Sequence, residues 1–142
     1  MTMPTLRRTL IAVPAVMLTL AATGWSATAP HSVTQITLDP LPPNILQFGQ
    51  NITVAFSYDA TEAGGVRIWA RPMTTTPGGD VLTPNYAACG SPIYPVGSGA
   101  GSCTFTITDG SALVDKIRIQ MYDASGTTLL FQAKLPVHYK YR

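Results

Sequence analysis

The stretch GVRIWARP, residues 65–72, decides the fold, because its side chains alternate in character. Apolar residues alternate with basic or aromatic ones: Val66, Ile68 and Ala70 against Arg67, Trp69 and Arg71. Successive side chains of a β-strand point to opposite faces of a sheet, so the alternation predicts a strand with one face in the core. Trp69 is then expected on the outer face, between two arginines. The alternative is the reversed parity, with Trp69 in the core.

Short alternating segments recur along the chain, separated by turn residues, and no helical period follows residue 30. The predicted strands are 33–38, 51–58, 65–72, 86–89, 103–108, 115–123 and 129–141. Segment 73–85 is expected to be a loop with at most a short edge strand, and the proline-rich segment 39–44 does not suit a sheet centre. The pattern predicts an all-β fold, a single antiparallel β-sandwich of about seven strands.

Two stacked sheets explain why each predicted strand has one apolar and one polar side. The residues expected to face inward are Ile52, Val54, Phe56, Tyr58, Phe105, Ile107, Ile117, Ile119, Met121, Leu135, Val137, Tyr139 and Tyr141. A chain of 142 residues suits one domain with one such core.

Residues 1–29 have the composition of a secretory signal peptide. Arg7 and Arg8 precede an almost wholly apolar run, 10–22, and Ala27-Thr28-Ala29 forms a small-x-small pattern. The apolar run is too short for a membrane span, which needs about 20 residues. The sequence therefore predicts a signal peptide at 1–29, cleaved between 24 and 29, and a domain at 30–142.

Export would leave a domain without net charge. The whole chain has nine Lys and Arg against seven Asp and Glu, and Arg7 and Arg8 account for the excess. A neutral domain without a basic run does not suit nucleic-acid binding. We expect an exported protein, periplasmic or extracellular, with no membrane span after signal removal.

The two cysteines, Cys89 and Cys103, flank the Gly/Ser/Pro-rich segment GSPIYPVGSGAGS. An oxidising compartment lets such a pair form a disulfide, and closing a loop of this length stabilises by about 3 kcal/mol in the chain-entropy model. A metal site is the alternative, but His31 and His138 lie at opposite ends of the domain. We expect the disulfide and no metal.

The segment between the cysteines carries three apolar residues, Ile93, Tyr94 and Val96. One interpretation is that they fold back to cover a sheet edge. The other is a recognition loop that the disulfide holds in order, so that less entropy is lost on binding.

The segment PPNILQFGQNITVAFSY, residues 42–58, resembles the lead-in to the second strand of immunoglobulin-like domains. The matching positions are Pro43, Gly49, Gln50, Ile52 and Val54. GGVRIWARP, followed by DKIRIQMYD and a long final strand, is similar to the Ig-like modules of bacterial exported and cell-surface proteins. The resemblance implies an Ig-like sandwich but no function. The antibody-type disulfide is absent, because Val54 and Ile119 fill the strands that would carry it.

An Ig-like topology would place the strand of Trp69 beside the strand of Arg118. The candidate binding face then consists of Arg67, Trp69, Arg71, Arg118, Gln120 and Tyr122, with Gln132, Lys134, His138 and Lys140 as an extension. One role is structural, in which guanidinium groups stack on the indole and shield it. The other is docking, since Trp, Tyr and Arg dominate interface energetics. The docked partner could be a protein or, through ring stacking and arginine forks, a carbohydrate or other polyanion.

No catalytic residue and no cofactor is predicted. The acidic residues lie mostly at strand ends and turns, and no nucleophile-elbow, zinc-protease, phosphate-loop or EF-hand motif is present. A Ca²⁺ site between loops stays open, because it needs no motif. The sequon Asn51-Ile52-Thr53 matters only in a eukaryotic secretory pathway. We therefore expect a non-enzymatic module with a binding or structural role, whose partner is a protein or a polysaccharide; an enzyme with a carboxylate pair from two loops is the remote alternative.

Overall fold

The computed structural model describes residues 30–142, and the predicted signal peptide lies outside the described residues. The strands are β1 (His31–Asp39), β2 (Asn44–Leu46), β3 (Asn51–Ala60), β4 (Val66–Thr76), β5 (Gly79–Leu82), β6 (Tyr86–Ala88), β7 (Gly97–Ile107), β8 (Ala112–Asp123) and β9 (Leu129–Tyr141). Within this described part, no helix is long and apolar enough to cross a bilayer.

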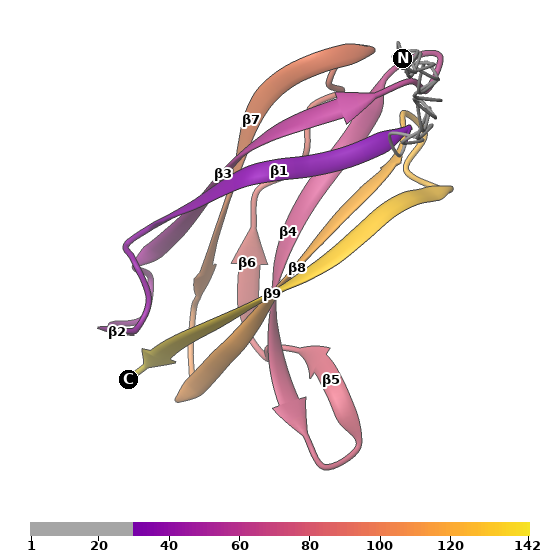
Figure 1. Cartoon of the computed structure of the whole chain (residues 1–142). Coiled ribbons are helices and arrows are strands. Elements are labelled where there is room, and N and C mark those ends of the chain that lie inside the picture. Colours follow the sequence, from indigo (N-terminus) through magenta and orange to yellow (C-terminus); the bar gives the residue numbers. More distant parts are fainter. Residues whose placement is uncertain (1–29) are drawn as a thin grey trace, which may run out of the picture.

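The strands form two sheets, one of four strands in the order β1-β3-β7-β6 and one of five in the order β2-β9-β8-β4-β5 (Figure 1). All pairs are antiparallel except β2 and β9, which run parallel. Buried side chains from both sheets belong to one apolar cluster. The predicted all-β architecture is therefore confirmed, and it consists of two sheets around a single core.

The strand faces that were predicted to point inward line the apolar core. Ile52 and Val54 of β3 and Ile117 and Ile119 of β8 are completely buried. Each alternates with a more exposed neighbour, as a strand with one buried face requires. On β9, Tyr139 and Tyr141 are also fully buried, whereas Leu135 and Val137 are only partly covered.

The glycine-rich half of the segment between the cysteines is a strand and not a loop, because β7 begins at Gly97 and not after Cys103. Its glycines give room to aromatic rings. A Cβ on Gly99 would lie 2.6 Å from the Tyr58 hydroxyl, and a Cβ on Gly101 would lie 2.5 Å from the Tyr94 ring. The composition that suggested a flexible loop instead lets the strand backbone approach two buried tyrosines.

Segment 73–85 also holds more strand than predicted. β4 continues to Thr76 and turns through Gly79 into β5, with Met73 opposite Leu82. Pro72 lies inside β4 opposite Ile117 of β8, and its carbonyl accepts from the Thr83 amide at 3.0 Å, on the side where β5 pairs with β4.

The short strand β2 lies in the proline-rich connection between β1 and β3, where no strand was predicted. It runs beside the end of β9, with Asn44 opposite Tyr139. The Tyr139 hydroxyl donates to the Pro40 carbonyl at 2.5 Å, and the Tyr141 hydroxyl donates to the Gln50 carbonyl at 2.9 Å. Two buried tyrosines thus attach the last strand to the first connection.

Candidate functional site

The side chains of β4 and β8 point to the sides of the sheet that the sequence pattern predicts. Val66, Ile68 and Ala70 of β4 are buried, and the side chains between them face outward and are partly exposed. The basic-aromatic face consists of Arg67, Trp69 and Arg71 on β4 and Arg118, Gln120 and Tyr122 on β8. The cross-strand pairs are Arg67 with Tyr122, Trp69 with Gln120, and Arg71 with Arg118. All six predicted residues therefore share one face, and Trp69 is not in the core.

Trp69 is packed by its neighbours on this face. The Tyr122 ring meets it edge-on, with centroids 5.3 Å apart and an interplanar angle of 74°. The Arg71 guanidinium carbon lies 5.5 Å from the centre of the indole. A Cβ on Gly126, in the turn between β8 and β9, would be 3.4 Å from the far end of the indole. The indole therefore belongs to a stacked ladder and does not present a bare ring to solvent.

Arg67 has a structural role at one end of the face. Its Nε donates to the Ala124 carbonyl at 2.8 Å, and its terminal nitrogen donates to the Ser91 carbonyl at 2.7 Å. The side chain thus joins the turn between β8 and β9 to the segment after β6. Two of its five N–H donors are therefore occupied within the chain, and its membership of the candidate binding face stays a prediction.

Gln120 is also not the exposed group that alternation predicted, since only 5% of the residue is accessible. It lies between Trp69 on β4 and Gln132 on β9, and its amide nitrogen donates to the Gln132 side-chain oxygen at 2.8 Å. Large neighbours on both sides cover it. Its own side-chain oxygen has no hydrogen-bond partner.

Arg71 and Arg118 lie directly opposite each other in the centre of the face. Among residues 30–142, no carboxylate lies within 4.0 Å of either guanidinium, because both ion pairs of the described chain involve lysines. The Nε of Arg118 is buried and has no hydrogen-bond partner. Two positive groups thus share a site that holds no anion of this chain.

Lys116 and Lys134, the two lysines next to Arg118 on this side of the sheet, pair with one carboxylate. Asp80 of β5 accepts from Lys116 at 2.6 Å and from Lys134 at 2.5 Å. These hydrogen bonds, first from Lys116 and then from Lys134, hold the pKa of Asp80 well below its usual range. Lys134, predicted as part of the extended face, therefore shares one carboxylate of the β4–β5 hairpin with Lys116.

The rest of the predicted extension follows the outer side of β9. Gln132, His138 and Lys140 are exposed there, alternating with partly or fully buried residues. Gln132 lies beside Gln120, whereas Lys140 is opposite Leu113 at the far end of the strand. Only Gln132 and Lys134 therefore adjoin the basic-aromatic face.

The three residues of the candidate binding loop differ in how far they are buried. Tyr94 is buried, with its ring 5.2 Å from that of Tyr58, and burial raises its pKa. Its backbone exchanges two hydrogen bonds with Val66, at 2.8 and 2.9 Å. Tyr94 is thus a core residue that covers the edge of β4, which corrects its assignment to a binding surface. Ile93 and Val96 are about half exposed.

The predicted disulfide is not formed in the structure. Cys89 is exposed, Cys103 is buried, and their sulfur atoms are 3.4 Å apart, whereas an S–S bond is about 2.05 Å long. Burial raises the pKa of the Cys103 thiol to about 11. The two cysteines are therefore adjacent and free.

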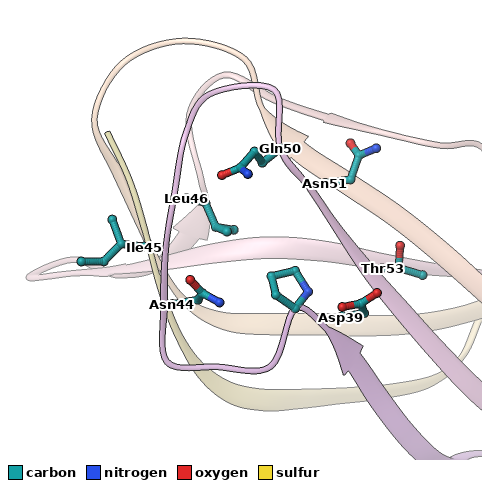
Figure 2. Close-up of a pocket in the computed structure, with 8 residues that line it drawn as sticks. Asp39, Asn44, Ile45, Leu46, Gln50, Asn51 and Thr53 are labelled. Carbon is teal, nitrogen blue, oxygen red and sulfur yellow. The ribbon is translucent and has the colours of Figure 1, made fainter.

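Sequence reasoning did not find a polar cavity of about 520 Å³ at the loop that joins β1 to β3 (Figure 2). Its lining includes Asp39, Asn44, Gln50, Asn51 and Thr53. Only one of these is a carboxylate, and the side-chain oxygen of Gln50 accepts from the backbone of Gln47 at 2.7 Å. Within residues 30–142, no group of three His, Cys, Asp or Glu side chains is placed to hold a metal ion.

Comparison with known proteins adds no identification. No family model matches the chain, and no curated protein matches it significantly.

Proposed function

We propose that this chain is an exported, non-enzymatic Ig-like module that docks onto a partner through its basic-aromatic face. The single observation that carries the docking role is the opposed pair of Arg71 and Arg118, which has no carboxylate partner within the described chain. Arginine and aromatic side chains that share one face are also the residues most enriched at binding hot spots.

The strand order supports the Ig-like assignment. If the edge strands β2 and β5 of the second sheet are set aside and the other seven are lettered in chain order, with β1 as A, β3 as B, β4 as C, β6 as D, β7 as E, β8 as F and β9 as G, the sheets are ABED and CFG. This is the arrangement of constant-type immunoglobulin domains. Val54 and Ile119, on the B and F strands, are fully buried where antibody domains carry their cysteines.

Export rests on the sequence of residues 1–29, with its basic start, its short apolar run and its small-residue end. Amino-terminal sequencing of the protein recovered outside the cytoplasm tests it. A first residue between positions 25 and 30 is expected. Recovery of the intact chain from the cytoplasm would contradict export.

The docking face is tested by charge reversal. Arg118→Glu should abolish capture of the natural partner by crosslinking in the envelope or secretion fraction, while the domain still melts cooperatively. Ser102→Glu is the matched control, because Ser102 is an exposed outer residue of the other sheet. Equal capture by both variants would contradict docking through the basic-aromatic face.

A polysaccharide is the other candidate partner, but one observation disfavours it. Sugar rings stack on open aromatic faces, whereas the Trp69 ring is covered by Arg71 and flanked by Tyr122 and Gly126. We therefore propose a protein partner.

A further inference from the structure

The pairing of Arg71 with Arg118 has an energetic cost that the described chain does not offset. Like charges at directly opposed positions destabilise an antiparallel pair of strands. Within residues 30–142, the acidic residues that approach this end of the sheet, Asp80 and Asp115, contact the lysines and the Thr75 amide and not these arginines. An arrangement that costs stability and lacks an internal counter-ion is suited to an external anion.

Before any ligand arrives, the Arg71 guanidinium is stacked on an indole and the Nε of Arg118 is buried. Arg71 is stacked on Trp69, at 5.5 Å from the ring centre. Arg118 has a buried Nε, and only 5% of its neighbour Gln120 is exposed. The Nε and the Gln120 side-chain oxygen both lack hydrogen-bond partners. A stacked guanidinium loses little conformational entropy on binding, and a carboxylate oxygen can accept from the unpaired Arg118 Nε–H. The Gln120 oxygen is itself an acceptor and would not bond to the carboxylate.

Of the three arginines of this face, Arg71 and Arg118 are the two that form no hydrogen bond or ion pair within the described residues. Asp80 binds both Lys116 and Lys134 and so offsets one of their two charges, and Arg67 donates to two backbone carbonyls. The arginine donors that are free on this face are thus a pair of planar forks. Guanidinium forks match the two oxygens of a carboxylate in geometry and charge.

We propose that Arg71 and Arg118 together clamp the carboxylate of an acidic side chain on a partner protein. The inference rests on the docking function proposed above and names the chemical group that docks. The surface around the clamp favours a protein over a sugar chain, because the covered indole offers no stacking platform.

The clamp is tested by titrating the exported protein with a short oligoglutamate peptide. The readout is the nuclear magnetic resonance signal of the arginine Nε–H groups, which reports each guanidinium separately. The signals of Arg71 and Arg118 should shift together and saturate, while that of Arg67 stays nearly constant because its Nε already donates to Ala124. Shifts of equal size at Arg67 would contradict the proposal.

Substitutions at Arg71 and Arg118 distinguish bidentate binding by a guanidinium fork from attraction to a positive charge alone. Arg71→Gln and Arg118→Gln should each weaken oligoglutamate binding about tenfold, the value of one charge-assisted hydrogen bond. Arg71→Lys and Arg118→Lys keep the charge but lose the fork, so most of the affinity should still be lost. Lys140→Gln is the matched control, since it removes one exposed charge from the far end of the same side of the sheet. A tenfold loss in this control would show diffuse attraction and overturn the clamp.

Stability gives a second readout. Because the two arginines repel each other, Arg118→Gln should leave the melting temperature unchanged or raise it, whereas a merely structural arginine would lower it. Tighter binding of dextran sulfate or polygalacturonate than of oligoglutamate, lost in the same variants, would replace the protein partner by a polysaccharide. No oligoglutamate binding, combined with loss of natural-partner capture in Arg118→Glu, would reject the clamp while leaving the docking face intact.

Discussion

Trp69 illustrates how a large aromatic residue can lie on an outer face without forming an exposed apolar patch. Its ring is enclosed by Tyr122 at its edge, by the Arg71 guanidinium over its face and by Gly126 at its far end. Each contact comes from a residue that alternation or turn chemistry places on that side. The sequence predicts the face, but the degree of cover depends on the β8–β9 turn folding over it.

Trp69→Ala should cost about 1–2 kcal/mol of unfolding free energy, the sum expected for one aromatic pair and one exposed cation–π contact. Phe105→Ala is the control, because Phe105 is 1% exposed and its deletion should cost about 3–5 kcal/mol. Urea unfolding of both variants measures the difference. Equal losses would place Trp69 energetically in the core.

Gly101 is required because the Tyr94 ring leaves no space for a side chain. The ring cannot move aside freely, since it packs on Phe56 at 5.9 Å and on Tyr58 at 5.2 Å. Gly101→Ala should therefore cost about 1–3 kcal/mol, as overpacking a well-filled core does. Gly90→Ala, where an added Cβ meets no atom within 4 Å, should be nearly neutral. If both changes are neutral in a thermal melt, Tyr94 does not need the glycine.

Among the elements, the strands with strict alternation were predictable and those without it were not. β3, β8 and β9 follow their sequence pattern closely, because each buries one face against the other sheet. The first half of β7 reads as Gly, Ser and Ala, and it is a strand because it pairs with β3 from Ala60 onward. β2 is only three residues long and exists through its pairing with β9. Both segments are strands because they pair with strands distant in the sequence, and no local sequence pattern indicates that pairing.

The distance between the sulfur atoms of Cys89 and Cys103 depends on how β6 pairs with β7. Cys89 follows β6 directly and its amide donates to Thr104 of β7, so the two sulfurs are brought to 3.4 Å by strand pairing alone. In an oxidising compartment the bond should close with a movement of about an ångström, and reduction should then lower the unfolding free energy by about 3 kcal/mol. Alkylation of the native exported protein followed by mass spectrometry checks this. Two labelled thiols without added reductant would mean that the pair stays open.

For the candidate site, sequence predicted the shared face but not the partners within it. Alternation placed Arg67 and Gln120 on the outer side correctly. It could not show that Arg67 reaches the carbonyls of Ser91 and Ala124, or that Trp69 and Gln132 cover Gln120. These contacts depend on register across three strands and on where two loops fold. The unpaired arginines could be identified only once Asp80 was placed beside the lysines.

At the scale of the whole molecule, two buried tyrosines attach the last strand to the connection between β1 and β3. Tyr139 and Tyr141 of the last strand donate to carbonyls of Pro40 and Gln50, close to the first strand. Both side chains are completely buried, and burial raises both pKa values from 10.0 to about 12. The native state therefore keeps both phenols protonated at a pH where the unfolded chain begins to lose those protons.

This difference predicts a loss of stability in alkaline solution. A group with a raised native pKa contributes its full stability below the unfolded value, and the contribution disappears as pH rises through the native value. Unfolding free energy should thus decline from about pH 10 to about pH 12, the interval between the two pKa values. The double variant Tyr139→Phe, Tyr141→Phe should lose about 1 kcal/mol per hydroxyl at neutral pH but show a flatter alkaline profile, because its rings cannot ionise. Urea unfolding across this pH range measures both effects, with Tyr86→Phe, on the short strand β6, as the control for removing a tyrosine. If the unfolding free energy of the double variant declines as steeply with rising pH as that of the natural chain, groups other than Tyr139 and Tyr141 cause the loss of stability.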